Sequence, residues 1–184
     1  MKKLPFIISG LILVALCACH HNNLWNDYEE WRIANNQWYN EQASKKGDYG
    51  EPYYRLVQPA WYPTSGVLIK YFNDRSQTEN NLSPMLTSYV DVKYKGVLYN
   101  DVAFDSSYAN TADGDSIYRF KVSDMIPGWQ LVLCDMHVGD SCETIIPYGQ
   151  GYGDVQQGII PPYSALKFNI KLVDIYRYES EPNE

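Results

Sequence analysis

Histidine and cysteine are scarce in this sequence, and their scarcity limits the chemistry that the chain can carry. The 184 residues include three histidines and four cysteines, and His137 is the one histidine beyond residue 21. No Cys or His spacing is typical of a zinc site, and no nucleophile motif accompanies His137. The glycine-rich run YGQGYGDVQQG (148–158) lacks the Lys-Ser/Thr of a phosphate-binding loop. We therefore expect no metal, no cofactor and no catalytic nucleophile.

Positive charge is also in short supply. The chain has 15 Lys and Arg residues against 22 Asp and Glu residues, a formal net charge of −7. Removing residues 1–18, which hold two lysines and no acid, would make it −9. A chain this acidic has little attraction for nucleic-acid phosphates or for anionic lipid. We expect no nucleic-acid partner.

The longest apolar run lies at the start of the chain. Lys2 and Lys3 precede LPFIISGLILVAL, which is short for a membrane span, and the run ends in LCAC. This pattern predicts a signal peptide over residues 1–18. LCAC resembles the bacterial lipobox, which implies that Cys19 becomes the lipidated first residue, anchored to a membrane by its acyl chains. An ordinary secretory signal and a retained transmembrane helix are the alternatives. We expect a lipid-anchored protein of the bacterial cell envelope, on the outer membrane facing the periplasm.

Two cysteines remain for the folded part of the chain, Cys134 and Cys142. Export would permit a disulfide between them. Two buried thiols are the alternative, and the sequence leaves the choice open.

The segment from about residue 24 to 43 is expected to be an amphipathic helix. Its large side chains recur at steps of three and four residues; they are Trp25, Tyr28, Trp31, Asn35 and Trp38. Such an aromatic stripe packs on something. The candidates are the domain that follows, a second copy of the chain in a homodimer through residues 24–43, or another partner. The run SKKGDYGEP then ends the helix.

Beyond Pro63 the hydrophobic pattern changes from a helical period to a period of two. Alternation predicts strands at 67–72, 88–98, 116–122, 141–147 and 165–176. One short helix is expected among them, after Gly128. The fold class is therefore α+β, an antiparallel twisted sheet packed on one short helix and preceded by an N-terminal helix.

Four blocks in this region carry a resemblance to a known family. They are VDVKYKGVLYNDVAFDSS, YRFKVSDMIPGWQLVLCDMHVGD, IIPYGQGYG and GIIPPYSALKFNIKLVDI. In this order and at these separations they resemble the FKBP-type peptidyl-prolyl cis-trans isomerase domain, over residues 64–178. The resemblance implies an FKBP-like fold. It leaves residues 19–63 as a tether with the N-terminal helix, and residues 179–184 as an acidic tail.

The resemblance also implies a set of site residues. The catalytic residues are Asp105, Trp129 and Tyr152, and the substrate-binding residues are Tyr94, Phe104, Tyr118, Met125, Ile126, Ile159, Ile160 and Phe168. In the family the tryptophan forms the floor under the substrate's proline ring, which would explain a Trp directly after the Pro-Gly pair at a helix start. The Tyr152 hydroxyl and a backbone N–H near Ile160 are the expected donors to a substrate carbonyl. Asp105 would either orient Tyr94 or polarise the amide carbon.

Isomerising an X-Pro bond needs no acid, base or nucleophile, since binding the twisted amide better than the planar one lowers the barrier of about 18–20 kcal/mol. The sequence thus predicts a peptidyl-prolyl isomerase acting on proline-containing clients among exported proteins. One alternative is a non-catalytic FKBP-like binding or chaperone module of an envelope complex. Another is a structural part of a surface complex, with residues 24–60 as its interface.

Overall fold

A computed structural model of the chain describes residues 23–59, 66–110 and 114–176. The predicted signal peptide, Cys19 and the predicted acidic tail lie outside the described residues. Among the described ranges, no helix combines the length and the hydropathy that crossing a membrane requires.

The body of the molecule is a seven-stranded sheet in which every pairing is antiparallel. The strands are β1 (Arg55–Val57), β2 (Val67–Tyr71), β3 (Tyr89–Leu98), β4 (Ala103–Ser106), β5 (Tyr118–Lys121), β6 (Ser141–Ile146) and β7 (Leu166–Tyr176). Their order is β1-β2-β6-β7-β3-β4, and β5 also pairs with β3. The longest ladder joins β3 to β7, from Leu98 opposite Leu166 to Tyr89 opposite Tyr176. Two long central strands therefore carry the shorter ones at the edges.

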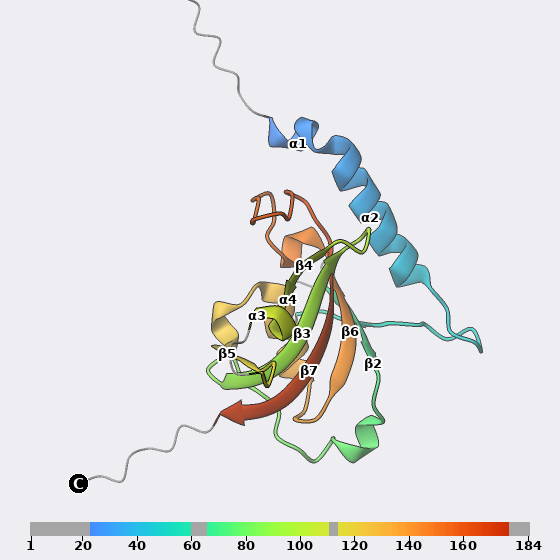
Figure 1. Cartoon of the computed structure of the whole chain (residues 1–184). Helices are drawn as coiled ribbons and strands as arrows, with labels where there is room; N and C mark the ends of the chain where they lie inside the picture. Colours follow the sequence, from blue (N-terminus) through green and yellow to red (C-terminus); the bar gives the residue numbers. More distant parts are fainter. Residues whose placement is uncertain (1–22, 60–65, 111–113, 177–184) are drawn as a thin grey trace, which may run out of the picture.

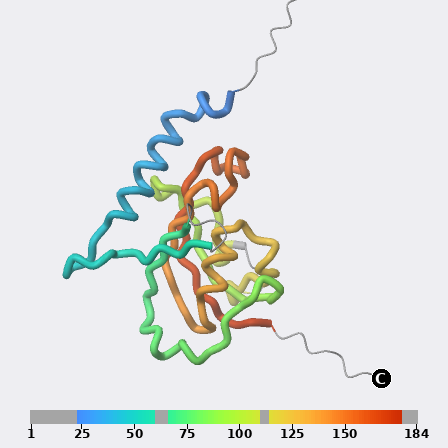
Figure 2. The backbone as a smooth tube through the Cα atoms, turned by 180° about the vertical axis from the view of Figure 1, so that it is seen from behind, coloured from blue at the N-terminus to red at the C-terminus, as the bar shows by residue number. Residues whose placement is uncertain are grey.

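The helices lie on both sides of this sheet. They are α1 (Leu24–Asp27), α2 (Glu29–Ser44), α3 (Ser107–Asn110) and α4 (Pro127–Asp135), with 3₁₀ turns η1 (Arg75–Gln77), η2 (Val122–Asp124) and η3 (Tyr148–Gln150). Figure 1 shows α4 to the left of the strands and the long α2 crossing above and to the right of them. The start of α1 and the end of β7 lie at opposite ends of the molecule (Figures 1 and 2).

Alternation along β2 divides its side chains between these two sides. Val67 and Ile69 belong to the main core, which α4 completes with Trp129 among its buried residues. Leu68, which points the other way, joins a smaller cluster that packs against Trp38 of α2. Because successive strand residues face opposite sides of a sheet, one strand can support a helix on each.

The structure confirms the α+β class with an antiparallel sheet and an N-terminal helix. Each predicted strand is present within two residues of its expected ends, and the helix after Gly128 is α4. β1 and β4 were not predicted, because strands of three or four residues give too little alternation to recognise. β1 also lies ahead of the expected domain start at residue 64, so the sheet begins inside the segment described as a tether.

The two cysteines of the folded part are free thiols in this structure, but they are not the two buried thiols that were the alternative to a disulfide. Cys134 is exposed and Cys142 is buried. The Cys142 sulfur lies 3.9 Å from the Met136 sulfur.

Candidate active site

A small cavity of about 220 Å³ lies between the sheet and the start of α4. Its lining is mostly aromatic and consists of Tyr94, Phe104, Asp105, Tyr118, Phe120, Asp124, Met125, Ile126, Trp129, Tyr152 and Phe168. These residues come from β3, β4, β5, η2, α4, β7, the link between η2 and α4 and the loop after η3. Nine of them are residues that the sequence analysis placed in a site. The fold therefore gathers into one cavity residues that lie as far apart as 94 and 168.

Trp129 is at the centre of this aromatic group and is 4% exposed. Its ring meets the rings of Tyr94 and Phe168 edge to face, with centroids 5.2 and 5.1 Å away and interplanar angles of 89° and 87°. The ring of Phe120 lies 5.5 Å away. Edge-to-face pairs at these distances are favourable and restrict rotation of the ring. Trp129 is thus held rigidly as part of the cavity wall.

The Pro-Gly pair before Trp129 sets the position of this ring. Pro127 is the first residue of α4, where its missing N–H costs nothing. Gly128 lies so close to β6 that a Cβ there would come within 2.4 Å of an Ile146 methyl. The start of α4 can therefore rest directly on the sheet, with Trp129 at the third helical position.

Gly96 leaves space for two aromatic rings of the cavity wall. A Cβ at this position would lie 2.6 Å from Phe104 and 2.7 Å from Phe168. The two phenylalanine rings pack edge to face on each other, 5.4 Å apart, over the bare backbone of β3. The glycine two residues after Tyr94 thereby makes room for the cavity's aromatic lining.

The polar side of the cavity is a pair, Tyr94 and Asp105. The Tyr94 hydroxyl donates to the Asp105 carboxylate over 2.6 Å, and the Ser106 N–H donates to the other carboxylate oxygen over 2.8 Å. Burial, followed by the hydrogen bond to Asp105 and its negative charge, raises the pKa of Tyr94. This hydrogen bond is the contact that the first expected role of Asp105, orienting Tyr94, requires.

The two serines after Asp105 fix this pair to the sheet. The Tyr94 N–H donates to the Ser107 hydroxyl over 3.0 Å, and the Ser106 hydroxyl donates to the Tyr94 carbonyl over 3.2 Å. Ser107 is completely buried. Ser106 at the end of β4 and Ser107 at the start of α3 therefore both hydrogen-bond the backbone of β3 at Tyr94.

Tyr152 brings a hydroxyl to the cavity from the loop after η3. Burial, and next the charge of Asp105, raise the pKa of Tyr152, so it stays protonated and can donate a hydrogen bond. Within the described ranges its hydroxyl has no hydrogen-bond partner. The hydroxyl could therefore donate to an acceptor such as a substrate carbonyl without breaking a hydrogen bond within the protein.

Two predicted site residues lie elsewhere. Ile159 is 63% exposed, Ile160 is buried in the main core, and neither lines the cavity. The Ile160 N–H donates to the Gln157 carbonyl over 2.9 Å, in a two-residue bridge between these positions. The expected donor near Ile160 is thus already engaged within the loop.

Two lining residues were missed by the sequence analysis. Phe120 was not among the predicted site residues, and it is both core and cavity wall; its alternation with Tyr118 was a usable signal. Asp124, in η2, gave no such signal, since a single acid before an apolar run is common on protein surfaces.

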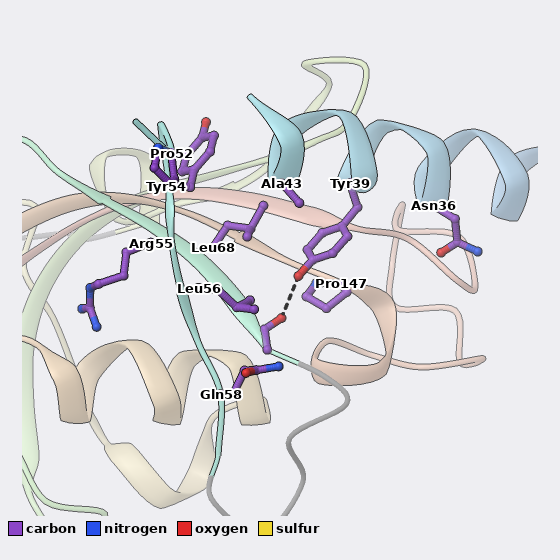
Figure 3. A pocket seen from close by; sticks show the side chains of 11 residues that line it. Asn36, Tyr39, Ala43, Pro52, Tyr54, Arg55, Leu56, Gln58, Leu68 and Pro147 are labelled. Carbon is purple, nitrogen blue, oxygen red and sulfur yellow. Dashed lines mark hydrogen bonds between the residues drawn. The ribbon is translucent and has the colours of Figure 1, made fainter. Parts of the chain in front are cut away.

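A larger cavity of about 850 Å³ lies between α2 and the edge formed by β1 and β2 (Figure 3). None of the predicted site residues lines it. The Tyr39 hydroxyl donates to the Gly66 carbonyl there over 3.1 Å. Across the described part of the chain, no group of three or more His, Cys, Asp or Glu residues could hold a metal ion in either place.

Comparison with known proteins gives a consistent result. Residues 81–173 match the family model of the FKBP-type peptidyl-prolyl cis-trans isomerase. The FKBP-type 22 kDa peptidyl-prolyl cis-trans isomerase of Escherichia coli is 39% identical over 93 residues, 50% of this chain and 43% of the relative. The peptidyl-prolyl cis-trans isomerase Mip of Coxiella burnetii is 34% identical over 100 residues, 54% of this chain and 42% of the relative. The chain thus matches less than half the length of these relatives.

Solved structures share the fold. A peptidyl-prolyl cis-trans isomerase from Pseudomonas syringae matches with a TM-score of 0.62 and 22% identity, over 82% of this chain and 96% of that one. FkpA from Escherichia coli matches with a TM-score of 0.65 and 23% identity, over 83% of this chain and 62% of that one.

Proposed function

Because the chain belongs to the FKBP-type peptidyl-prolyl cis-trans isomerase family, we propose that it catalyses cis–trans isomerisation of X-Pro bonds in the aromatic cavity. The observation that carries the proposal is the rigid setting of Trp129 between Tyr94, Phe120 and Phe168, with the hydroxyl of Tyr152 at the same cavity. An apolar face and one donor are what a twisted prolyl amide would require.

The size of the cavity supports a proline ring as its occupant. At about 220 Å³ it is smaller than pockets for drug-sized ligands, which measure about 300–1,000 Å³. A single five-membered ring with its flanking amide is a ligand of a suitable scale, and the rest of a polypeptide would stay outside.

Catalysis would come from environment and orientation. The planar amide owes its rotational barrier to a charge-separated resonance form, which a water-poor aromatic site stabilises less than water does. A hydrogen bond from Tyr152 would fix the carbonyl of the bound peptide while the bond turns. Asp105, which accepts hydrogen bonds from Tyr94 and Ser106, would keep the Tyr94 ring in place at the cavity wall.

The test is a prolyl-isomerisation assay on the full chain in detergent, beside Trp129→Ala and Asp105→Ala. We expect the parent to accelerate cis–trans exchange of an X-Pro peptide, and both variants to lose at least tenfold in kcat/KM, about 1.4 kcal/mol of transition-state stabilisation. Val155→Ala, an exposed position outside the cavity lining, is the matched control and should stay fully active.

A folded parent that binds X-Pro peptides without accelerating their isomerisation would support the alternative, a non-catalytic binding or chaperone module. Circular dichroism of each variant separates a lost fold from a lost activity.

We also propose that the clients are exported proteins and that lipid on Cys19 anchors the chain in the cell envelope, on the outer membrane facing the periplasm. The support is the LCAC run after a short apolar segment. Labelling of growing cells with a radioactive fatty acid should mark the parent and not Cys19→Ser. A Cys19→Ser variant that is still labelled would overturn the lipid site.

A further inference from the structure

Helix α2 hydrogen-bonds directly to the segment of chain that follows Ile160. The Trp31 indole N–H donates to the Ser164 hydroxyl over 3.0 Å, and the Ala165 N–H donates to the Asn35 side-chain oxygen over 2.8 Å. The Ser164 hydroxyl in turn donates to the Pro161 carbonyl over 2.7 Å. Residues 161–165 are thus held by side chains that lie about 130 positions earlier in the chain.

Asn35 is an unusual residue for such a contact. It lies in the middle of α2 and is 1% exposed, where a helix packed on a domain ordinarily has an apolar side chain. Both ends of its amide are used, because its NH₂ donates to the Trp31 carbonyl over 2.8 Å. A buried amide that is hydrogen-bonded at both ends fixes one arrangement of the two segments, which an apolar contact would not do.

The segment that α2 holds contains a strained residue. Tyr163 has a φ of 61°, in the left-handed region that a bulky side chain rarely adopts. Its ring lies edge to face with Trp25 on one side and Tyr148 on the other, each with centroids 5.5 Å away. Such a conformation persists where surrounding contacts impose it, and strain of this kind concentrates near functional sites.

Tyr163 connects this segment to the cavity. Its N–H donates to the Gly153 carbonyl over 2.8 Å, and the Gly153 N–H donates to the Tyr148 carbonyl over 2.9 Å. Tyr152, whose side chain lines the cavity, is the residue directly before Gly153. The contacts therefore run without a gap from α2 through Tyr163 to the backbone that carries Tyr152.

We propose that α2 is a positioning element of the isomerase site, in which Asn35 and Trp31 hold residues 161–165 and thereby place the Tyr152 hydroxyl in the cavity. This inference rests on the proposed isomerase function. Neither Asn35 nor Trp31 lines the aromatic cavity, so both act through the loop that they hold.

The experiment compares the full chain with Asn35→Ala, Tyr152→Phe and the double variant in the same detergent. Two quantities are measured, kcat/KM for an X-Pro peptide and hydrogen exchange at the Tyr163 and Ala165 amides. Gln37→Ala is the matched control, because Gln37 is on the exposed side of the same helix and bonds only Glu41 within it. Trp31→Phe, which keeps an aromatic ring but loses the donor to Ser164, is a second and milder variant.

We expect Asn35→Ala to lower kcat/KM roughly threefold to tenfold, since the hydrogen bond to the Ala165 N–H, which holds the loop behind Tyr152, is lost. Exchange at Tyr163 and Ala165 should become faster, while the amides of the β3–β7 ladder keep the protection of the parent. In the Tyr152→Phe background, adding Asn35→Ala should lower kcat/KM little further, because both changes remove the contribution of the positioned Tyr152 hydroxyl.

Three results would count against the inference. Unchanged exchange at Tyr163 and Ala165 would show that α2 does not order the loop. A loss of activity equally large in the Tyr152→Phe background would show that Asn35 does not act through Tyr152. A folded parent without isomerase activity would overturn the proposed function and this inference with it, whereas an active parent with an unaffected Asn35→Ala variant would overturn the inference alone.

Discussion

Gly96 lies beneath the rings of Phe104 and Phe168, where β3 passes under the cavity wall. Its φ is unremarkable, so the need for glycine comes from space and not from backbone conformation. Every other residue type would place a Cβ within 2.7 Å of both rings. At the scale of single residues, the cavity thus depends on the lack of a side chain at Gly96 as well as on the aromatic side chains that line it.

Gly96→Ala should therefore damage the site. The added methyl group would push the two phenylalanine rings into the cavity, with a loss of at least tenfold in kcat/KM and a fall in unfolding free energy of about 1–3 kcal/mol, as for other overpacked cores. Chemical denaturation and the isomerase assay measure the two effects. Gly149→Ala is the control, since nothing lies within 4 Å of the Cβ it would add. An active, equally stable Gly96→Ala variant would contradict the arrangement of the rings.

The two thiols should differ in reactivity. Burial raises the pKa of the Cys142 thiol to about 12, so almost none of it is thiolate at pH 8, and the side chain is fully enclosed. Cys134 is exposed at the end of α4, although partial burial raises its pKa as well. Iodoacetamide at pH 8, followed by peptide mass analysis, should label Cys134 and leave Cys142 unmodified until denaturant is added. If both residues resisted labelling in denaturant and became labelled only after reduction, they would form a disulfide, and the prediction of two free thiols would be wrong.

Tyr94, Asp105 and Trp129 were named as site residues because of the resemblance to the FKBP family, and the fold brings all three to one cavity. Ile159 and Ile160 lie outside the cavity lining, and their positions depend on the course of a loop. The bridge between Gln157 and Ile160 that turns the Ile160 N–H inward comes from backbone geometry, which side-chain identity does not predict.

At the scale of elements, a buried carboxylate joins η1 to the turn after α4. Asp140 is fully buried and accepts hydrogen bonds from the Thr78 hydroxyl over 2.5 Å, the Asn73 amide over 2.9 Å and the His137 N–H over 2.8 Å. Burial acts to raise the pKa of Asp140, but these hydrogen bonds and the positive charge of Arg75 outweigh it and lower the pKa. The folded state therefore binds the proton of this group less readily than the unfolded chain does.

This difference makes stability depend on pH in a definite direction. The contribution of Asp140 is fully present above its unfolded pKa of about 3.9 and is lost as the pH falls through that value toward the lower folded pKa. We expect the unfolding free energy of Asp140→Asn to be about 1–3 kcal/mol lower than that of the parent at pH 7. Between pH 5 and pH 3, the unfolding free energy of the variant should fall by less than that of the parent. Urea unfolding at a series of pH values measures both, with the exposed Asp154→Asn as control. Equal pH dependence in the parent and in Asp140→Asn would contradict this account.

The elements that the sequence did not predict are the short ones. β4 is four residues long; it pairs with β3, and the Ser106 hydroxyl also bonds the Tyr94 carbonyl, so its stability comes from tertiary contacts and not from its own pattern. The long strands β3 and β7 were predictable because alternation runs over ten and eleven residues in them.

At the scale of the whole molecule, the structure shows what covers the aromatic stripe of α1 and α2, which the sequence left open. The aromatic stripe was compatible with the following domain, a second copy or another partner, since a periodic pattern shows that a face is buried and not what buries it. In the structure Trp31 and Trp38 pack on Tyr99, at centroid distances of 5.0 and 6.4 Å, and Trp25 packs on Tyr163. The stripe is therefore used within one chain, which leaves less apolar surface for a homodimer.

The chain should accordingly be a monomer. A homodimer through residues 24–43 would have to use the outer side of α1 and α2, where the exposed large apolar side chains are Leu24, Trp25 and Ile33, at 40%, 47% and 51% exposed. Sedimentation equilibrium of the full chain in density-matched detergent should give the mass of one chain. Ile33→Glu should leave that mass unchanged, because the charge would face solvent. A parent with twice the mass that Ile33→Glu reduces to one chain would show that the outer face of α2 holds two copies together, and the docked helix would then serve assembly as well as the site.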